Sequence, residues 1–422
     1  MIAFIGIADT YMVSSFGDAA VAGVSLATGI DKFVKSLFAG LAAGASVVVS
    51  QYIGADDKSG ASKSMKTGIQ LLCMMTVVVS ALMIIFKRPI LRLLYGAVEP
   101  DVMGASLEYF SVSVFSYPLV CLFNTSCSSY RAMGNSRITF LASMAMLGIN
   151  LVLKYIFIYH LKLGVTGAGL SSLIAYGSVA FYLIVSLHSA DNKVSLKRLH
   201  VYEGTKTMVK SILGIGIPNG VENGMFQLGH ILLQNLVSTL GTVAIAANAL
   251  YSNLSPLYHS LNSGFSVGIT TFTAQCMGAG SPKDARFYMR HILKLNYVLT
   301  AINGIIIIIF SKHLITIYGL SPEVTSVGHK LLLMYIAGAI FAYPSAFTYA
   351  NALRGTGDTK FTMVVSLCSM FGVRIGLAYI AVKVFHMGIY GVQLVMILEW
   401  FEKGLIYHIR ERRGKWQNIK VI

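Results

Sequence analysis

Residues 37–55 read LFAGLAAGASVVVSQYIGA, an apolar stretch rich in small residues that ends in a QYIG turn. Residues 261–279, LNSGFSVGITTFTAQCMGA, follow the same pattern at an offset of 224 residues. Identical residues occupy six paired positions at that offset: Leu37/Leu261, Gly40/Gly264, Gly44/Gly268, Gln51/Gln275, Gly54/Gly278 and Ala55/Ala279. A constant offset of about half the chain length indicates a duplicated fold.

The composition places this duplicated fold in a membrane. The 422 residues are 55% hydrophobic and only 12% charged, whereas soluble domains carry about 25% charged residues. Apolar runs of about 20 residues recur along the chain, which is the length that an α-helix needs to span a bilayer. Because lipid offers no hydrogen-bond partner to open strands, the composition predicts an all-α polytopic membrane protein.

The net charge of +16 does not indicate nucleic-acid binding, because most of the basic residues lie in short joins between apolar spans. We number the joins between consecutive apolar spans from the N-terminus. The even-numbered joins and the C-terminal tail hold 22 basic residues, and the odd-numbered joins hold 6. Short loops rich in Lys and Arg stay in the cytoplasm. The charge pattern therefore predicts that both termini are cytoplasmic.

Hydropathy and the Gly, Pro, Asn and Ser punctuation predict about twelve transmembrane helices. The predicted spans are 1–15, 18–50, 64–86, 101–132, 137–160, 166–188, 208–238, 243–274, 286–310, 323–352, 360–385 and 388–409. Six spans in each half give both halves the same orientation, so the two six-helix lobes form a parallel internal repeat, as in transporters with a central site.

The repeat also sets the expected domain boundaries. We expect an N-terminal lobe at 1–189, a cytoplasmic linker at 190–207, a C-terminal lobe at 208–410 and a basic cytoplasmic tail at 411–422. Only 16 residues precede Gly17, whereas the second half begins its helix near Met208, 33 residues before Gly241. The first helix is therefore expected to be truncated.

Several longer motifs identify the sequence as similar to the MATE (multidrug and toxic compound extrusion) family. These are ADTYMVSSFGDAAVAGVSLA, GASVVVSQYIGADD, YRAMGNSR, GIPNGVENGMFQ, TAQCMGAG and ALRGTGDTK. The resemblance covers essentially the whole chain. It implies twelve helices in two lobes, export of small organic cations, coupling to inward H⁺ or Na⁺ and no other cofactor.

The resemblance also implies an acidic cation site in the first helix, which falls on Asp9. A carboxylate at membrane depth is costly and is usually functional, and burial favours its protonated form. Asp9 is therefore the expected H⁺ or Na⁺ coupling residue; the alternative is a position near the outer interface. Glu222, four residues after Pro218, is a second coupling candidate, with a water-exposed helix end as the alternative.

Further ionisable and amide residues lie within the N-terminal apolar spans. Asp31 and Lys35 are one helical turn apart and can form an ion pair, or they can line a cavity together with Lys32. Lys154 departs from the family expectation of an acidic or neutral residue, and it could pair with Asp9. Asn124 and Asn150 either line a cavity or form interhelical hydrogen bonds.

Aromatic residues are abundant, with 22 Tyr and 22 Phe, and aromatic rings that line a cavity can bind organic cations. Tyr251, Tyr343 and Tyr349 are candidate cavity residues, and His259 is a candidate with a hydrogen-bonded helix position as its alternative. Arg374 is expected to pair with an acid inside the membrane. We interpret Glu402 with Lys403 as an interface anchor.

These observations favour a secondary antiporter of the plasma membrane that exports organic cations or drugs in exchange for H⁺ or Na⁺. It would be a multi-pass monomer surrounded by lipid. No phosphate-binding loop is present, since GAGSPKDA lacks the required Lys-Ser/Thr ending, and no enzyme or metal motif is found. Two alternatives remain: a lipid-linked saccharide flippase of a related fold, and a non-transporting membrane receptor or subunit.

Overall fold

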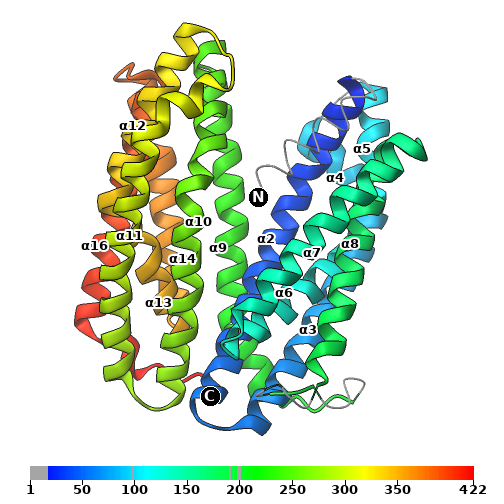
Figure 1. The fold of residues 1–422 in the computed structure, drawn as a ribbon, viewed down its shortest axis with the longest axis vertical. Coiled ribbons are helices and arrows are strands. Elements are labelled where there is room, and N and C mark those ends of the chain that lie inside the picture. Colours follow the sequence, from blue (N-terminus) through cyan, green and yellow to red (C-terminus); the bar gives the residue numbers. More distant parts are fainter. Residues whose placement is uncertain (1–17, 97–98, 190–191, 193, 197–200) are drawn as a thin grey trace. The chain divides into compact units, whose positions relative to one another are not determined.

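The computed structural model describes residues 18–96, 99–189, 192, 194–196 and 201–422, and within these residues it contains helices and no strand (Figure 1). The first half contains α2 (Asp18–Gly54), α3 (Lys58–Ile85), α4 (Lys87–Tyr95), α5 (Pro100–Ser113), α6 (Ser116–Ala132), α7 (Ser136–Tyr155), η1 (Ile156–His160) and α8 (Gly164–Leu187). The second half contains α9 (Lys206–Ser238), α10 (Thr242–Gly278), α11 (Pro282–Thr316), α12 (Pro322–Tyr343), η2 (Pro344–Thr348), α13 (Tyr349–Gly355), α14 (Thr359–Cys368), η3 (Ser369–Leu377), α15 (Ala378–Lys383), α16 (Gly388–Arg413) and η4 (Lys415–Asn418).

The long helices confirm the prediction of a polytopic all-α membrane protein. In the described residues, seven continuous helical segments are long and apolar enough to cross a membrane, or eight if α5 and α6, which meet at 46°, form one bent span. The more polar helices α9, α10 and α16 have 33, 37 and 26 residues, and each exceeds the roughly 20 residues that a span needs. The first predicted span, 1–15, lies outside the described residues.

The sequence repeat reappears in the positions of helices and turns. Helices α2 and α10 both contain 37 residues, and their bounds differ by the same 224 positions as the repeated motif. Lys162 and His386, also one repeat apart, have φ angles of 51° and 52°, and Gly164 and Gly388 share a φ of 58°. Non-glycine residues rarely adopt positive φ, so the matching turns show that the duplication extends to backbone conformation.

Two compact units divide the chain, Met1–Gly224 and Met225–Ile422. The division falls inside α9 rather than in the linker expected at 190–207. Contacts within the first unit explain this position, because the first half of α9 packs closely against α2. The lobe boundaries inferred from the repeat remain a prediction.

Glycines bring α2 and α9 together. A Cβ atom on Gly40 would lie 2.5 Å from the backbone nitrogen of Gly220, and one on Gly44 would lie 2.4 Å from the Cα atom of Gly216. Both helices therefore use a small-xxx-small spacing, which allows membrane helices to approach backbone to backbone.

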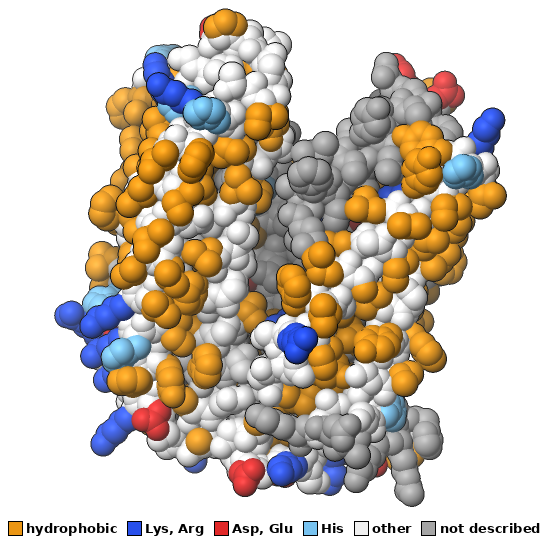
Figure 2. All heavy atoms as spheres, in the orientation of Figure 1, with side chains coloured by type: hydrophobic (Ala, Val, Ile, Leu, Met, Phe, Trp, Pro, Cys, Tyr) orange, Lys and Arg blue, Asp and Glu red, His pale blue; other side chains and the backbone are white. Residues whose placement is uncertain are grey.

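Apolar side chains cover the outer faces of the helices, as Figure 2 shows for one view. On α11 the exposed residues Ile302, Ile305, Ile306 and Ile309 form a stripe at helical spacing. Water would disfavour such a stripe, whereas lipid tails would not. The stripe is consistent with α11 facing the bilayer.

The C-terminal tail folds back onto the second unit. Trp416 in η4 is fully buried, and its Nε1 donates a hydrogen bond to the carbonyl oxygen of Glu411 at 3.1 Å. The Glu411 carboxylate is also fully buried and forms ion pairs with Arg286 at 3.0 Å and Arg290 at 3.2 Å. The basic tail predicted at 411–422 is thus tied to α11 at its beginning.

Candidate substrate cavity

A cavity of about 350 Å³ lies within the second unit. This volume falls within the range of roughly 300–1,000 Å³ that is usual for small-molecule sites. The residues that line it are Phe226, His230, Leu233, Gln234 and Val237 of α9; Asn248, Tyr251, Ser252, Ser255 and His259 of α10; Tyr335 and Tyr343 of α12; Phe347 of η2; Arg374 of η3; and Val392, Gln393, Met396 and Trp400 of α16.

Aromatic rings form much of the cavity wall and hold one another in place. The Tyr335 hydroxyl lies 2.6 Å from Nε2 of His259, and its ring centroid is 5.1 Å from that of Tyr251. The rings of Tyr343 and Phe347 stack with centroids 4.1 Å apart, and the rings of Tyr343 and Trp400 are nearly perpendicular, with centroids 5.3 Å apart. Such pairs favour fixed relative orientations, so the wall can present flat apolar surfaces to a ligand.

Two of the helices change their winding where they reach this cavity. The π-helical turns η2 and η3 interrupt the two longer helical segments that contain them, and they carry Phe347 and Arg374. Short π-helical insertions are rare in proteins, but those that occur are often found at functional sites. Each insertion rotates the side chains that follow it about the helix axis. Proline begins η2 at Pro344, where the missing N–H loosens the regular α-helical pattern.

A buried group of three charged residues adjoins the aromatic wall. Arg374 donates to Glu399 through Nε at 2.8 Å and also through Nη2, and Nζ of Lys403 lies 3.1 Å from the other oxygen of Glu399. All three side chains are at most 3% exposed. Glu399 is therefore the acid predicted to pair with Arg374. Two cations share one carboxylate, so the group carries one excess positive charge.

The same cations contact the aromatic rings. The Arg374 guanidinium lies 5.3 Å from the ring centroid of Phe226, and Nζ of Lys403 lies 5.0 Å from that of Phe347. Both distances are within the range of cation–π attraction. Lys403 is thus buried beside the cavity, and our interpretation of Lys403 as an interface anchor was wrong; the residue instead satisfies Glu399 one helical turn away.

The cavity brings together three of the four aromatic and histidine candidates from the sequence. Tyr251, His259 and Tyr343 all line it. Tyr349 is 4% exposed, packs in a separate apolar cluster and has its hydroxyl 3.3 Å from Nδ1 of His408. Tyr349 therefore lies outside the cavity wall.

In the first unit, Asp31 is the centre of a polar cluster. Its Oδ1 accepts hydrogen bonds from the hydroxyls of Tyr117 at 2.6 Å and Ser113 at 3.0 Å, and its Oδ2 lies 3.3 Å from Nζ of Lys35. The predicted Asp31–Lys35 ion pair is confirmed. Asp31 is 2% exposed, so these contacts tie α2 to α5 and α6. Lys32 is exposed and lies on a different side of α2.

The other candidates of the first unit are scattered. Asn150 is buried and donates from Nδ2 to Ser172 Oγ at 3.1 Å, which is the interhelical alternative. Asn124 on α6 is half-buried, and Lys154 on α7 is 4% exposed. Glu222 on α9 is 6% exposed. Asp9 lies outside the described residues, as does any pairing that it makes with Lys154.

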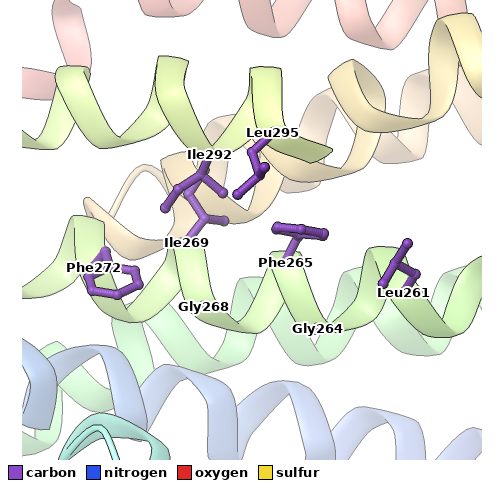
Figure 3. Close-up of a pocket in the computed structure, with 8 residues that line it drawn as sticks. All are labelled: Leu261, Gly264, Phe265, Gly268, Ile269, Phe272, Ile292 and Leu295. Atoms are coloured by element: carbon purple, nitrogen blue, oxygen red, sulfur yellow. The ribbon is translucent and has the colours of Figure 1, made fainter. Parts of the chain in front are cut away.

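A second hollow, a groove of about 380 Å³ along α10 and α11, is lined by apolar residues and glycine (Figure 3). Its wall includes Gly264 and Gly268, around which a Cβ atom would meet no described atom within 4 Å. Their repeat partners Gly40 and Gly44 are covered by α9. The groove offers none of the polar groups that orient a ligand, so the aromatic cavity is the better candidate site.

Sequence reasoning missed Gln393 and Trp400, which line the cavity from α16. Trp400 follows Gln393 by seven residues and Met396 by four, a spacing that places all three on one face of a helix. That spacing could have pointed to a lining face. Among the described residues, no group of three or more His, Cys, Asp or Glu side chains is placed to hold a metal ion.

Comparison with models of known protein families identifies the family to which this chain belongs. The MatE family model matches residues 1–156 and 218–380, which is more than half of the chain. The chain belongs to the MatE family. Its similarity to the MATE family, inferred from the motifs, is thereby confirmed.

Individual relatives and solved structures agree. The uncharacterized transporter YisQ of Bacillus subtilis is 27% identical over 98% of this chain and 91% of its own length. The probable multidrug resistance protein NorM of Thermotoga maritima is 24% identical, with 99% and 90% covered. An outward-facing multidrug resistance MATE transporter superposes with a TM-score of 0.90 at 20% identity, covering 97% of this chain and 91% of that chain.

A further structural neighbour is a MOP superfamily transporter from Pyrococcus furiosus, described as having a binding pocket of reverse polarity that suggests a different function. It superposes with a TM-score of 0.89 at 19% identity, covering 98% of this chain and 92% of that chain. At this identity the likeness concerns the fold. The fold of this MatE protein is therefore that of MATE transporters, and the helices of the described residues are consistent with the predicted layout of two six-helix lobes.

Proposed function

We propose that this MatE protein is a secondary active antiporter that exports aromatic organic compounds, organic cations among them, in exchange for H⁺ or Na⁺. The observation that carries the proposal is the cavity lined by aromatic side chains inside a membrane-spanning helical unit. Flat rings provide apolar contact and cation–π attraction to ligands of varied shape. Relatives named as multidrug resistance proteins support export as the direction of transport.

Coupling would depend on a carboxylate that binds the driving cation. Asp9 and Glu222 are the proposed coupling residues, because they are acids within apolar stretches of the sequence, where an ionisable group is costly and usually functional. Cation binding would shift the equilibrium between inward-open and outward-open states and weaken substrate binding, and linkage requires that the substrate weaken cation binding by the same factor. The proposed setting is the plasma membrane, with a monomer whose termini are both cytoplasmic.

Export of ethidium, measured as uptake into inside-out vesicles whose lumen corresponds to the cell exterior, tests this function. Ethidium should move against its gradient when an H⁺ gradient or a Na⁺ gradient is imposed, and the gradient that works identifies the coupling ion. Asp9→Asn should abolish coupled transport, whereas the exposed Asp101→Asn on α5 should leave transport unchanged. Equal efflux by both variants would refute the role of Asp9, and no gradient-driven efflux by the unmodified protein would refute antiport.

A second candidate function is a lipid-linked saccharide flippase. Buried basic residues favour it, since Lys154, Arg374 and Lys403 are each at most 4% exposed and could attract a phosphorylated headgroup. Headgroup translocation in proteoliposomes, without ethidium efflux, would support this candidate.

A further inference from the structure

We propose that the cavity of the second unit contains a carboxylate-binding subsite, formed by Arg374 and Trp400, that selects aromatic acids or aromatic zwitterions. Its use in transport rests on the proposed function, but binding at the subsite does not. The subsite adds a substrate class to an antiporter otherwise expected to carry cations.

The charge balance is the first step. Arg374 is the one charged side chain among the described residues that line the cavity, and no described lining residue is acidic. Glu399 forms ion pairs with both Arg374 and Lys403, so one positive charge remains uncompensated within this group of three residues. A buried charge without a partner is unfavourable. An anion in the cavity would supply the missing partner, whereas an organic cation would find no acidic side chain among the described lining residues.

Unused donors are the second step. Arg374 bonds Glu399 through Nε and Nη2, and its Nη1 donates to no described residue. Trp400 is 2% exposed, and its indole Nε1–H, a donor with no acceptor capacity, has no hydrogen-bond partner among the described residues. Buried donors are normally satisfied. Arg374 and Trp400 both line the cavity, so a carboxylate bound there would bring acceptor oxygens for these two donors.

The wall is the third step. Tyr251, Tyr343 and Phe347 provide aromatic surface around the same space. A volume of about 350 Å³ admits a fused two-ring compound with a short acidic side chain. An anionic group joined to an aromatic body would therefore satisfy both the donors and the rings.

Calorimetry on the purified full chain tests the subsite with three matched probes: naphthylacetate, its neutral amide naphthylacetamide, and naphthylethylammonium. The carboxylate should bind about tenfold more tightly than the amide, because hydrogen bonds to a charged group are worth at least one such factor, and the ammonium should bind most weakly. Equal binding of carboxylate and amide would overturn the proposal, as would displacement of the carboxylate by an equal concentration of chloride.

Single substitutions test whether the preference for the carboxylate over the amide depends on Arg374 and Trp400. Arg374→Gln should remove the preference for the carboxylate over the amide, and the exposed Arg413→Gln should retain it. Because Arg374→Gln also disturbs the buried ion group, Trp400→Phe is the second test: it keeps an aromatic ring, removes the N–H and should weaken carboxylate binding several-fold while leaving amide binding unchanged. Survival of the full preference in both variants would overturn the proposal.

Ethidium transport by the same purified protein, reconstituted into proteoliposomes, separates the two hypotheses. Carboxylate preference without any gradient-driven efflux would refute antiport and leave the subsite standing. Gradient-driven efflux without carboxylate preference would refute the subsite and leave antiport standing.

Discussion

Gly44 of α2 and Gly216 of α9 approach so closely that a Cβ atom on Gly44 would lie 2.4 Å from the Cα atom of Gly216. Gly44→Ala should therefore force two helices of the first unit apart. Overpacking of this kind costs about 1–3 kcal/mol. The expected result is a lower midpoint of thermal unfolding for the protein in detergent.

The repeat supplies the matched control for this substitution. Gly268 occupies the equivalent position on α10 and would meet no described atom within 4 Å of an added Cβ. Gly268→Ala should leave the midpoint unchanged or raise it slightly, since Ala stabilises a helix relative to Gly by up to about 1 kcal/mol. Equal midpoints for the two variants would contradict the close α2–α9 contact.

Glu399 is the single carboxylate for Arg374 and Lys403, so its charge should be important for the stability of the second unit. Glu399→Gln would leave two buried cations without a counter-charge, at a cost of about 3–5 kcal/mol. Thermal unfolding in detergent should show a large decrease in the midpoint. The exposed Glu323→Gln on α12 should change stability by less than about 0.5 kcal/mol; a similar small effect for Glu399→Gln would show that the ion group does not form.

Sequence could predict the helices and their duplication because both depend on local properties. Apolar length identified the spans, and one offset of 224 residues linked α2 to α10. The short helix α4 and the 46° bend between α5 and α6 were not predicted. The bend does not interrupt the apolar run of the predicted span 101–132, and α4 lies in the basic join after the span 64–86, where hydropathy gives no sign of a helix.

The candidate site was only partly predictable, because a lining role depends on which side of a helix faces the cavity. Tyr343 and Tyr349 are both aromatic residues on one predicted span, yet only Tyr343 lines the cavity. The π-helical turn η2 lies between them and changes the rotation of the residues that follow. The partner of Arg374 likewise could not be identified from the sequence, since Glu399 is 25 residues away on another helix and only the packing of the two helices brings them together.

Tyr117 should stabilise the first unit through its hydrogen bond to Asp31. The Tyr117 hydroxyl donates to Oδ1 of Asp31 at 2.6 Å, and both side chains are 2% exposed. Tyr117→Phe removes this charged hydrogen bond and should cost about 1.5–3 kcal/mol. Tyr155→Phe, at an exposed position on α7, is the control and should not change the unfolding midpoint. Identical midpoints would show that Asp31 does not depend on Tyr117.

Trp416 should fix the C-terminal tail to the second unit. It is fully buried, its Nε1 donates to the carbonyl oxygen of Glu411, and the Arg286 guanidinium lies 5.7 Å from its ring centroid. Trp416→Ala would remove these contacts and leave a cavity, at a cost of about 3–5 kcal/mol. Because these contacts join the tail to α16 and α11, their loss should appear first as local opening of the tail.

Limited carboxypeptidase digestion followed by mass spectrometry measures that opening. The Trp416→Ala protein should lose residues after Arg413 many times faster than the unmodified protein, while the helices before it stay intact. Lys420→Ala, at an exposed position in the same tail, should be digested at the unmodified rate. If both variants are trimmed equally fast, burial of Trp416 does not hold the tail in place.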